Sequence, residues 1–443
     1  MGAIWRASVE RFANWIQRAI IDRQSAIFIG PLLVGLLLIV VAYFLGIATV
    51  TDQVKQREVG YFAALNWSFT FCVVLPIAAE IAAMIIRCAR DSLREAAEAG
   101  LLITPQGEPV SPEVADRIWT DLVMQAAALS MVYLIFVEVV FISLWWDMSG
   151  SWLLGARQFY DVLPAEQVER DWTVAHFLTD RAVNAWFNAG FSLICHMLMA
   201  AVWTLFLGVY TFVLNYCIRL YNLSQINSPR SAMAVLVPDL REEAQEFGYE
   251  GVCRLFGQLL LFAGCTVVIL MLIRLQNAYL VSAKTSLVEL INPGLGEALG
   301  VAMGQGFLTG LGSLASTLLQ WYPGDIKTQM TILMCALVGS FVIVIAFSMS
   351  AFFERLSASA HFMVLHGLVG NIVIPGKLTS AERRLKALPA ARSKSATPIR
   401  IALFIILAIA PIIYVNFSLL YIAILIGSAV RYLMRNARTE ATP

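Results

Sequence analysis

The chain has 443 residues, of which 59% are hydrophobic and only 14% are charged, with a formal net charge of +1. Soluble domains contain about 45–50% apolar and about 25% charged residues, so this chain has too little polar surface to enclose a water-soluble core. The composition excludes soluble, disordered and fibrous proteins, and the balanced charge gives no basis for binding nucleic acid, whose phosphates require a basic face. We predict an all-α, polytopic integral membrane protein.

The first 25 residues predict an amphipathic helix. Apolar side chains recur there at helical spacing, and most of the arginines lie off this stripe. This pattern is typical of a helix that lies in the membrane interface. Such a helix is either a plain anchor before the first membrane span or a lipid sensor or partner helix. The apolar stripe consists of Trp5, Val9, Phe12, Ile16 and Ile20.

Residues 26–430 are expected to form a single transmembrane domain. A membrane-spanning helix requires about 20 mostly apolar residues, because the hydrocarbon offers no water to satisfy backbone groups. Seven such runs lie near residues 26–50, 61–86, 122–146, 182–218, 256–275, 330–353 and 401–430. Run 182–218 is long enough to project beyond the hydrocarbon at about 1.5 Å per residue.

Two positions refine these boundaries. Ser111 followed by Pro112 and Glu113 predicts the start of a helix ahead of the third run. The last run is interrupted by Pro411 and Asn416, so one tilted crossing and a short hairpin both fit it. The predicted number of spans is therefore seven or eight.

Basic residues predict the orientation, because Lys and Arg concentrate in cytoplasmic loops. They are frequent in residues 1–25 and 354–400 and sparse in residues 276–329. We therefore expect a cytoplasmic N-terminus and a cytoplasmic basic loop at 354–400, followed after the last run by a tail at 431–443. The basic loop either binds anionic lipid headgroups or is a solvated linker. Its candidate headgroup ligands are Arg383, Arg384, Lys386, Arg392 and Lys394.

A glycine-rich segment at 295–319 is apolar, but as a crossing it would place the basic loop outside the cell. We therefore expect a re-entrant or interfacial segment on the outer side. Its glycines recur at four-residue spacing, which lets helix backbones approach closely in lipid. The segment would line a pathway, form a subunit interface or serve packing alone. The glycines concerned are Gly296, Gly300, Gly304, Gly306 and Gly310.

Three ionisable residues lie inside the predicted spans, where a charge costs about 2.5–3.5 kcal/mol. Glu80 lies toward the cytoplasmic side, His196 near mid-depth and Glu138 toward the outer side. Pro76, one turn before Glu80, would free a backbone carbonyl and open a polar pocket. The staggered depths suit a proton or cation relay. The alternative is that all three are uncharged polar groups that fix helix packing.

The sequence predicts no enzyme, cofactor or metal site, because it contains no HExxH, GxSxG, P-loop or CxxC motif. The leading functional hypothesis is a channel or carrier subunit of the bacterial inner membrane, with a proton or cation link. The alternative is a structural scaffold subunit of a multi-protein membrane or secretion assembly. A third interpretation, an intramembrane enzyme that modifies lipid, would need polar ligands clustered at one depth. The expected partners are membrane lipids together with other membrane subunits or further copies of the chain.

Overall fold

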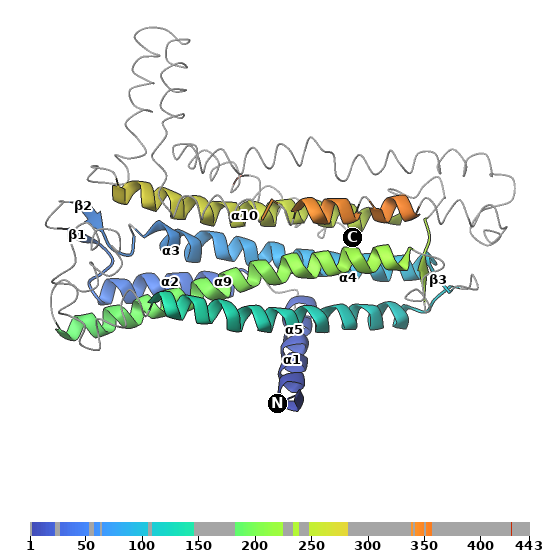
Figure 1. Cartoon of the computed structure of the whole chain (residues 1–443), viewed down its shortest axis with the longest axis horizontal. Helices are drawn as coiled ribbons and strands as arrows, with labels where there is room; N and C mark the ends of the chain where they lie inside the picture. Colours follow the sequence, from blue (N-terminus) through green and yellow to red (C-terminus); the bar gives the residue numbers. More distant parts are fainter. Residues whose placement is uncertain are drawn as a thin grey trace, which may run out of the picture.

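The computed structural model describes most of the first 281 residues and a few later segments. The described residues are 2–22, 27–52, 57–62, 64–104, 109–145, 182–224, 234–238, 248–281, 338–339, 342–349, 351–356 and 427. They are mostly helical, and the long helices lie side by side along the longest axis of the molecule (Figure 1).

Within the described residues, four helices are long and apolar enough to cross a membrane: Leu65–Glu98, Pro112–Ser143, Gly190–Leu223 and Glu250–Ile273. This confirms the predicted helical class in its coarser form but does not confirm seven or eight spans. The glycine-rich segment 295–319 lies outside the described residues, as do most of the runs 330–353 and 401–430.

The first long helix is built from three consecutive elements, α3 (Leu65–Phe69), the π-helical turn η2 (Thr70–Val74) and α4 (Leu75–Glu98). The others are α5 (Pro112–Trp145), α9 (Ala182–Leu223) and α10 (Glu250–Val281). The α5 helix packs along α9, and α4 packs along α10 and more briefly against α5. The helix start predicted at Ser111–Pro112 is confirmed.

The helix α2 (Ile29–Phe44) is shorter than the predicted run 26–50 and packs against η2. Its 16 residues reach about 24 Å. Gly46 follows the helix with φ +69°, a left-handed conformation that favours glycine and ends the helix. The chain then turns into a two-stranded antiparallel ribbon, β1 (Val50–Asp52) with β2 (Arg57–Val59).

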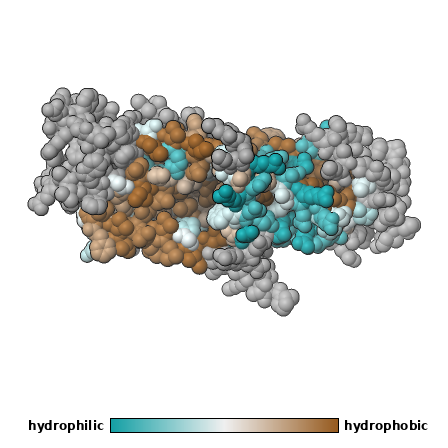
Figure 2. Space-filling model, turned by 90° about the horizontal axis from the view of Figure 1, so that it is seen from below, coloured by the Kyte–Doolittle hydropathy of each residue, from teal (hydrophilic) through white to brown (hydrophobic). Residues whose placement is uncertain are grey.

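The α5 helix crosses from a polar to an apolar environment. Its exposed side chains are polar as far as Gln125, including Glu113, Asp116 and Asp121. From Leu129 to Ile142 the exposed side chains are apolar: Leu129, Val132, Leu134, Ile135, Phe136, Val139, Val140 and Ile142. Figure 2 shows a similar trend among the coloured residues, with brown predominating toward one side of the visible face and teal toward the other. The exposed surface of α5 therefore changes from polar to apolar between Gln125 and Leu129.

The polar end of the bundle is closed by a second small ribbon. The strand β3 (Leu102–Ile103), after α4, pairs antiparallel with β4 (Val235–Leu236), after α9. Beside the ribbon, the hydroxyl of buried Tyr249 donates a hydrogen bond of 2.8 Å to the carbonyl of Val237. Residues 87–98 of α4 and 219–223 of α9 lie beyond the predicted apolar runs and continue the helices to this ribbon.

The N-terminal helix α1 (Gly2–Ile16) and the π-helical turn η1 (Gln17–Asp22) leave the bundle at a steep angle (Figure 1). The α1 helix packs against α5, and Val9 and Ala13 are buried. The indole N–H of Trp119 on α5 donates a hydrogen bond of 3.1 Å to the side-chain oxygen of Gln17. The predicted amphipathic helix therefore forms, and part of its apolar stripe is used for packing against protein.

The turn before Pro76 determines how closely α2 approaches. Proline has no N–H to donate to the preceding turn, and π-helical turns accommodate such irregularities. The widened turn brings the Phe71–Cys72 backbone against Gly35 of α2. A Cβ added at Gly35 would lie 2.6 Å from the Phe71 carbonyl oxygen and 3.0 Å from the Cys72 Cα. Glycine is required at this crossing because the opposing atoms are backbone and cannot rotate away.

We expect Gly35→Ala to destabilise the protein by about 1–3 kcal/mol, because the added methyl group forces α2 away from η2. Gly30→Ala on the same helix is the matched control, since a Cβ there meets nothing within 4 Å. The measurement is thermal unfolding of the detergent-solubilised protein. Equal losses for the two variants would contradict the proposed close crossing.

Candidate functional site

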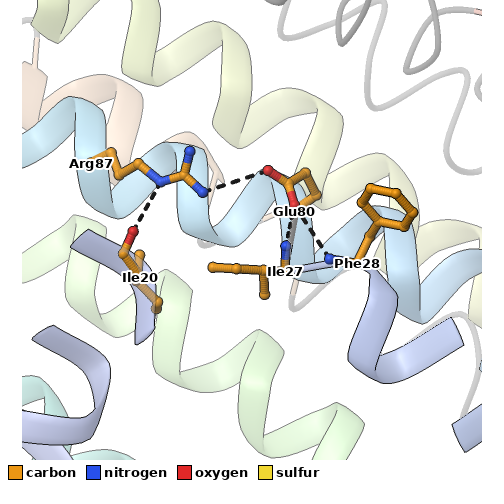
Figure 3. A network of polar contacts seen from close by, with 5 residues as sticks. All are labelled: Ile20, Ile27, Phe28, Glu80 and Arg87. Carbon is orange, nitrogen blue, oxygen red and sulfur yellow. Dashed lines mark hydrogen bonds and ion pairs between the residues drawn. The ribbon is translucent and has the colours of Figure 1, made fainter. Parts of the chain in front are cut away.

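The strongest polar network among the described residues centres on Glu80 of α4 (Figure 3). The Oε2 of Glu80 accepts hydrogen bonds from the backbone N–H groups of Ile27, at 3.0 Å, and Phe28, at 3.3 Å. These groups lie at the start of α2, where N–H groups have no partner within the helix and a negative charge is favourable. Glu80 therefore caps α2 from a neighbouring helix.

Arg87 lies two turns after Glu80 and on the same face of α4. Its Nη2 is 3.5 Å from the Oε1 of Glu80. Its Nε donates a hydrogen bond of 3.1 Å to the carbonyl of Ile20 in η1. A guanidinium is favourable at this position, because the carbonyls at the end of a helical segment carry partial negative charge.

We call Ile20, Ile27, Phe28, Glu80 and Arg87 the α1–α2 corner. Arg87, the cation of the pair, binds the end of the N-terminal helical segment, and Glu80, the anion, binds the start of α2 (Figure 3). The side chains are 15% and 24% exposed, respectively, so water screens the pair less than it screens a surface pair. The corner therefore fixes the direction of α1 relative to the bundle.

His196 lies on α9 and is buried, with 7% of its surface exposed. Its Nδ1 is 2.8 Å from the backbone oxygen of Ser192, and because a carbonyl can only accept, Nδ1–H is the donor. The rings of Trp67 and Phe141 approach it edge-on, at centroid distances of 5.3 and 6.4 Å. These contacts enclose the imidazole between α3 and α5.

Glu138 lies on α5, one turn before Phe141 and among the outward-facing apolar residues of that helix. Its Oε2 is buried and has no hydrogen-bond partner in the part of the chain that the structure describes. A carboxyl group in this position is costly unless it is neutral or paired. Among the described residues, the buried Oε2 of Glu138 is thus a hydrogen-bond acceptor that is not used.

The structure places the predicted site residues in two separate environments. Glu80 belongs to the α1–α2 corner, whereas Glu138 and His196 lie on the packed helices α5 and α9, with Phe141 next to both. Pro76 is buried in α4 directly after η2, where the sequence predicts a polar pocket. The five predicted packing glycines, 296–310, and the five predicted headgroup ligands, 383–394, lie outside the described residues.

Sequence reasoning missed the role of Arg87, which lies just beyond the predicted run 61–86. Its seven-residue spacing from Glu80 is the signal that could have joined the two, since such residues share a helix face. It also missed the bond between Ser92 of α4 and Tyr216 of α9, whose hydroxyl groups are 2.5 Å apart. Gly251 of α10 packs beside this bond, where an added Cβ would lie 2.7 Å from the Ser92 Cβ. Contacts of this kind, between single residues of different helices, leave no pattern in the sequence.

A family model described as RcgA-like matches residues 12–301. The chain belongs to the RcgA-like family. The match includes the α1–α2 corner, Glu138 and His196, whereas the basic loop at 354–400 and the run at 401–430 lie beyond it. No curated protein and no solved structure matches the chain. The family match assigns no activity to this RcgA-like protein.

We expect the Glu80–Arg87 pair to show a coupling free energy of about 1 kcal/mol or more in a double-mutant cycle with Glu80→Gln and Arg87→Gln. The exposed pair Arg94–Glu98, 2.9 Å apart and about half exposed on each side, is the matched control and should give about 0.3–0.5 kcal/mol. The readout is the free energy of unfolding in detergent. Equal coupling for the two pairs would show that the corner is no stronger than a surface contact.

Proposed function

We propose that this RcgA-like protein is a scaffold subunit of a multi-protein assembly in the bacterial inner membrane, with its N-terminus in the cytoplasm. The single observation that carries the proposal is the engagement of Glu80. Its Oε2 accepts hydrogen bonds from two backbone N–H groups, and its Oε1 lies 3.5 Å from the guanidinium of Arg87 in an ion pair. A relay carboxylate must exchange protons or cations, so this arrangement favours a structural role.

The polar half of the bundle supports the same proposal. The helices continue beyond the apolar surface and are joined there through buried side chains, including the hydroxyl pair Ser92–Tyr216. Exposed charges cover this half, among them Asp91, Arg94 and Glu95 on α4. A rigid, charged projection of four helices would give a partner protein a fixed binding surface.

A photo-crosslinking experiment in cells tests the scaffold role. A benzophenone amino acid at Glu113, exposed on the polar half of α5, is expected to form adducts with one defined partner protein or with a second copy of the chain. The control position for the crosslinking amino acid is Phe136, whose side chain is 68% exposed on the apolar half. We expect Asp116→Lys with Asp121→Lys to reduce the adduct severalfold, because the exposed charges would guide docking. A protein that gives no adduct at Glu113 and stays monomeric in mild detergent would be inconsistent with a scaffold.

Transport remains a second candidate, and the unused oxygen of Glu138 is the observation that favours it. Glu138 and His196 lie on packed helices and both adjoin Phe141, so a change in side-chain rotamer could bring the two groups together. A proton or cation would then pass between α5 and α9, and Glu80 would take no direct part.

Ion flux into proteoliposomes tests this candidate. Under a relay, Glu138→Gln should abolish proton- or cation-coupled flux, because the amide cannot carry the charge. Glu80→Gln is the matched variant, and it should lower stability more than flux. Flux that is unchanged in the double variant Glu80→Gln with Glu138→Gln would rule out a relay through these carboxyl groups.

A further inference from the structure

We propose that the outward face of the N-terminal helical segment, formed by Arg11, Trp15 and Arg18, binds the phosphate headgroups of anionic lipids. This inference rests on the membrane location in the proposed function, but it requires neither the scaffold role nor the transport role. It assigns a ligand class to a surface that lies far in sequence from the basic loop at 354–400.

The level at which α1 leaves the bundle is the first argument. Two contacts hold η1 there, from Trp119 of α5 to Gln17 and from Arg87 of α4 to Ile20. Trp119 lies six residues before Gln125, the last polar exposed residue before the apolar surface begins, so it lies about 9 Å to the polar side along the helix. Lipid headgroups occupy about 5–7 Å beyond each face of the hydrocarbon, so Trp119 lies at the outer edge of this layer. Long arginine and tryptophan side chains on the helix can extend from there to the headgroups.

The direction of α1 is the second argument. The helix runs at a steep angle to the long helices (Figure 1), so it lies roughly parallel to a membrane that those helices cross. Val9 and Ala13 are buried, and they fix which side of α1 is turned away from solvent. The helix is therefore held at headgroup level in a defined rotational setting.

The chemistry of the opposite side is the third argument. Arg11, Trp15 and Arg18 are spaced i, i+4 and i+7, which places them on one face, and all three are exposed. The side chain of Trp15 is 60% exposed and its ring stacks on Phe12 at a centroid distance of 5.9 Å. Tryptophan suits the membrane interface because it is large and apolar with one polar edge.

Charge completes the assignment. Neither Arg11 nor Arg18 forms an ion pair with another residue in the described ranges, whereas Arg6 pairs with Glu10 at 3.2 Å. Guanidinium groups bind phosphate oxygens through two parallel hydrogen bonds. Two such groups on either side of an exposed indole match a layer of phosphodiesters, and the positive face favours lipids with a net negative charge.

The test uses the full chain in nanodiscs of phosphatidylcholine with increasing amounts of phosphatidylglycerol. Hydrogen exchange of the peptides within residues 4–22 should slow as phosphatidylglycerol is added. The dependence of this slowing on the phosphatidylglycerol content gives an apparent affinity for the lipid. The double variant Arg11→Gln with Arg18→Gln should weaken that apparent affinity about fivefold for each arginine removed. Trp15→Ala should weaken binding to both lipid compositions.

Arg6→Gln is the matched control, because it removes the same charge from a position that is already paired with Glu10. It should keep the response to phosphatidylglycerol, and thermal unfolding should confirm that all variants are folded. Exchange that is identical in both lipid compositions would overturn the headgroup assignment, as would protection that appears only when an acidic partner protein is added. Failure of the chain to enter nanodiscs would instead count against the proposed membrane location.

Discussion

The α1–α2 corner meets a constraint that applies wherever a helix at the membrane surface gives way to one in the hydrocarbon. Such a break leaves backbone carbonyls at one helix end and N–H groups at the next without partners, and little water is present to replace them. Here one face of α4 serves both ends, because Arg87 binds the carbonyl of Ile20 while Glu80 accepts from the N–H groups of Ile27 and Phe28. The two charges also compensate each other at 3.5 Å, which lowers the cost of placing them next to the apolar half.

The sequence predicted the helical class and four apolar runs that the described residues show as long helices, but it underestimated the length of these helices. A hydropathy run marks only the part of a helix that is apolar enough for hydrocarbon. The helix itself continues for as long as its backbone hydrogen bonds do. The α4 helix continues to Glu98, where its exposed polar side is supported by the pair Arg94–Glu98, and α10 begins with the pair Glu250–Arg254. Pairs at i, i+4 on an exposed face stabilise a helix that has lost its apolar surroundings. The polar half of the bundle is built in this way, and a search for spans alone does not detect it.

The candidate site was predictable as a set of residues but not as a set of contacts. The rarity of ionisable groups in apolar runs marked Glu80, Glu138 and His196, and all three prove to be partly or fully enclosed. Their partners could not be predicted, because the N–H groups of Ile27 and Phe28 and the carbonyl of Ser192 belong to the backbone, which is the same for every residue type. The relay hypothesis arose from depth alone, and depth does not distinguish groups that face one another from groups that face different helices.

The corner also bears on which parts of the bundle can move. Glu80 and Arg87 are two turns apart on one helix, so a rotation of α1 relative to α2 has to break at least one of their backbone contacts. The pair α2–α4 is further held by the close crossing at Gly35, which leaves no space for sliding past Phe71. The helices α5 and α9 have a hydroxyl bond from Tyr133 to Thr211 and a close contact of Gly208 with the Ser130 side chain, both of which rotamer changes can release. Side-chain rotamers between α5 and α9 can therefore change while the backbone contacts of Glu80 and Arg87 still hold the N-terminal segment and the start of α2.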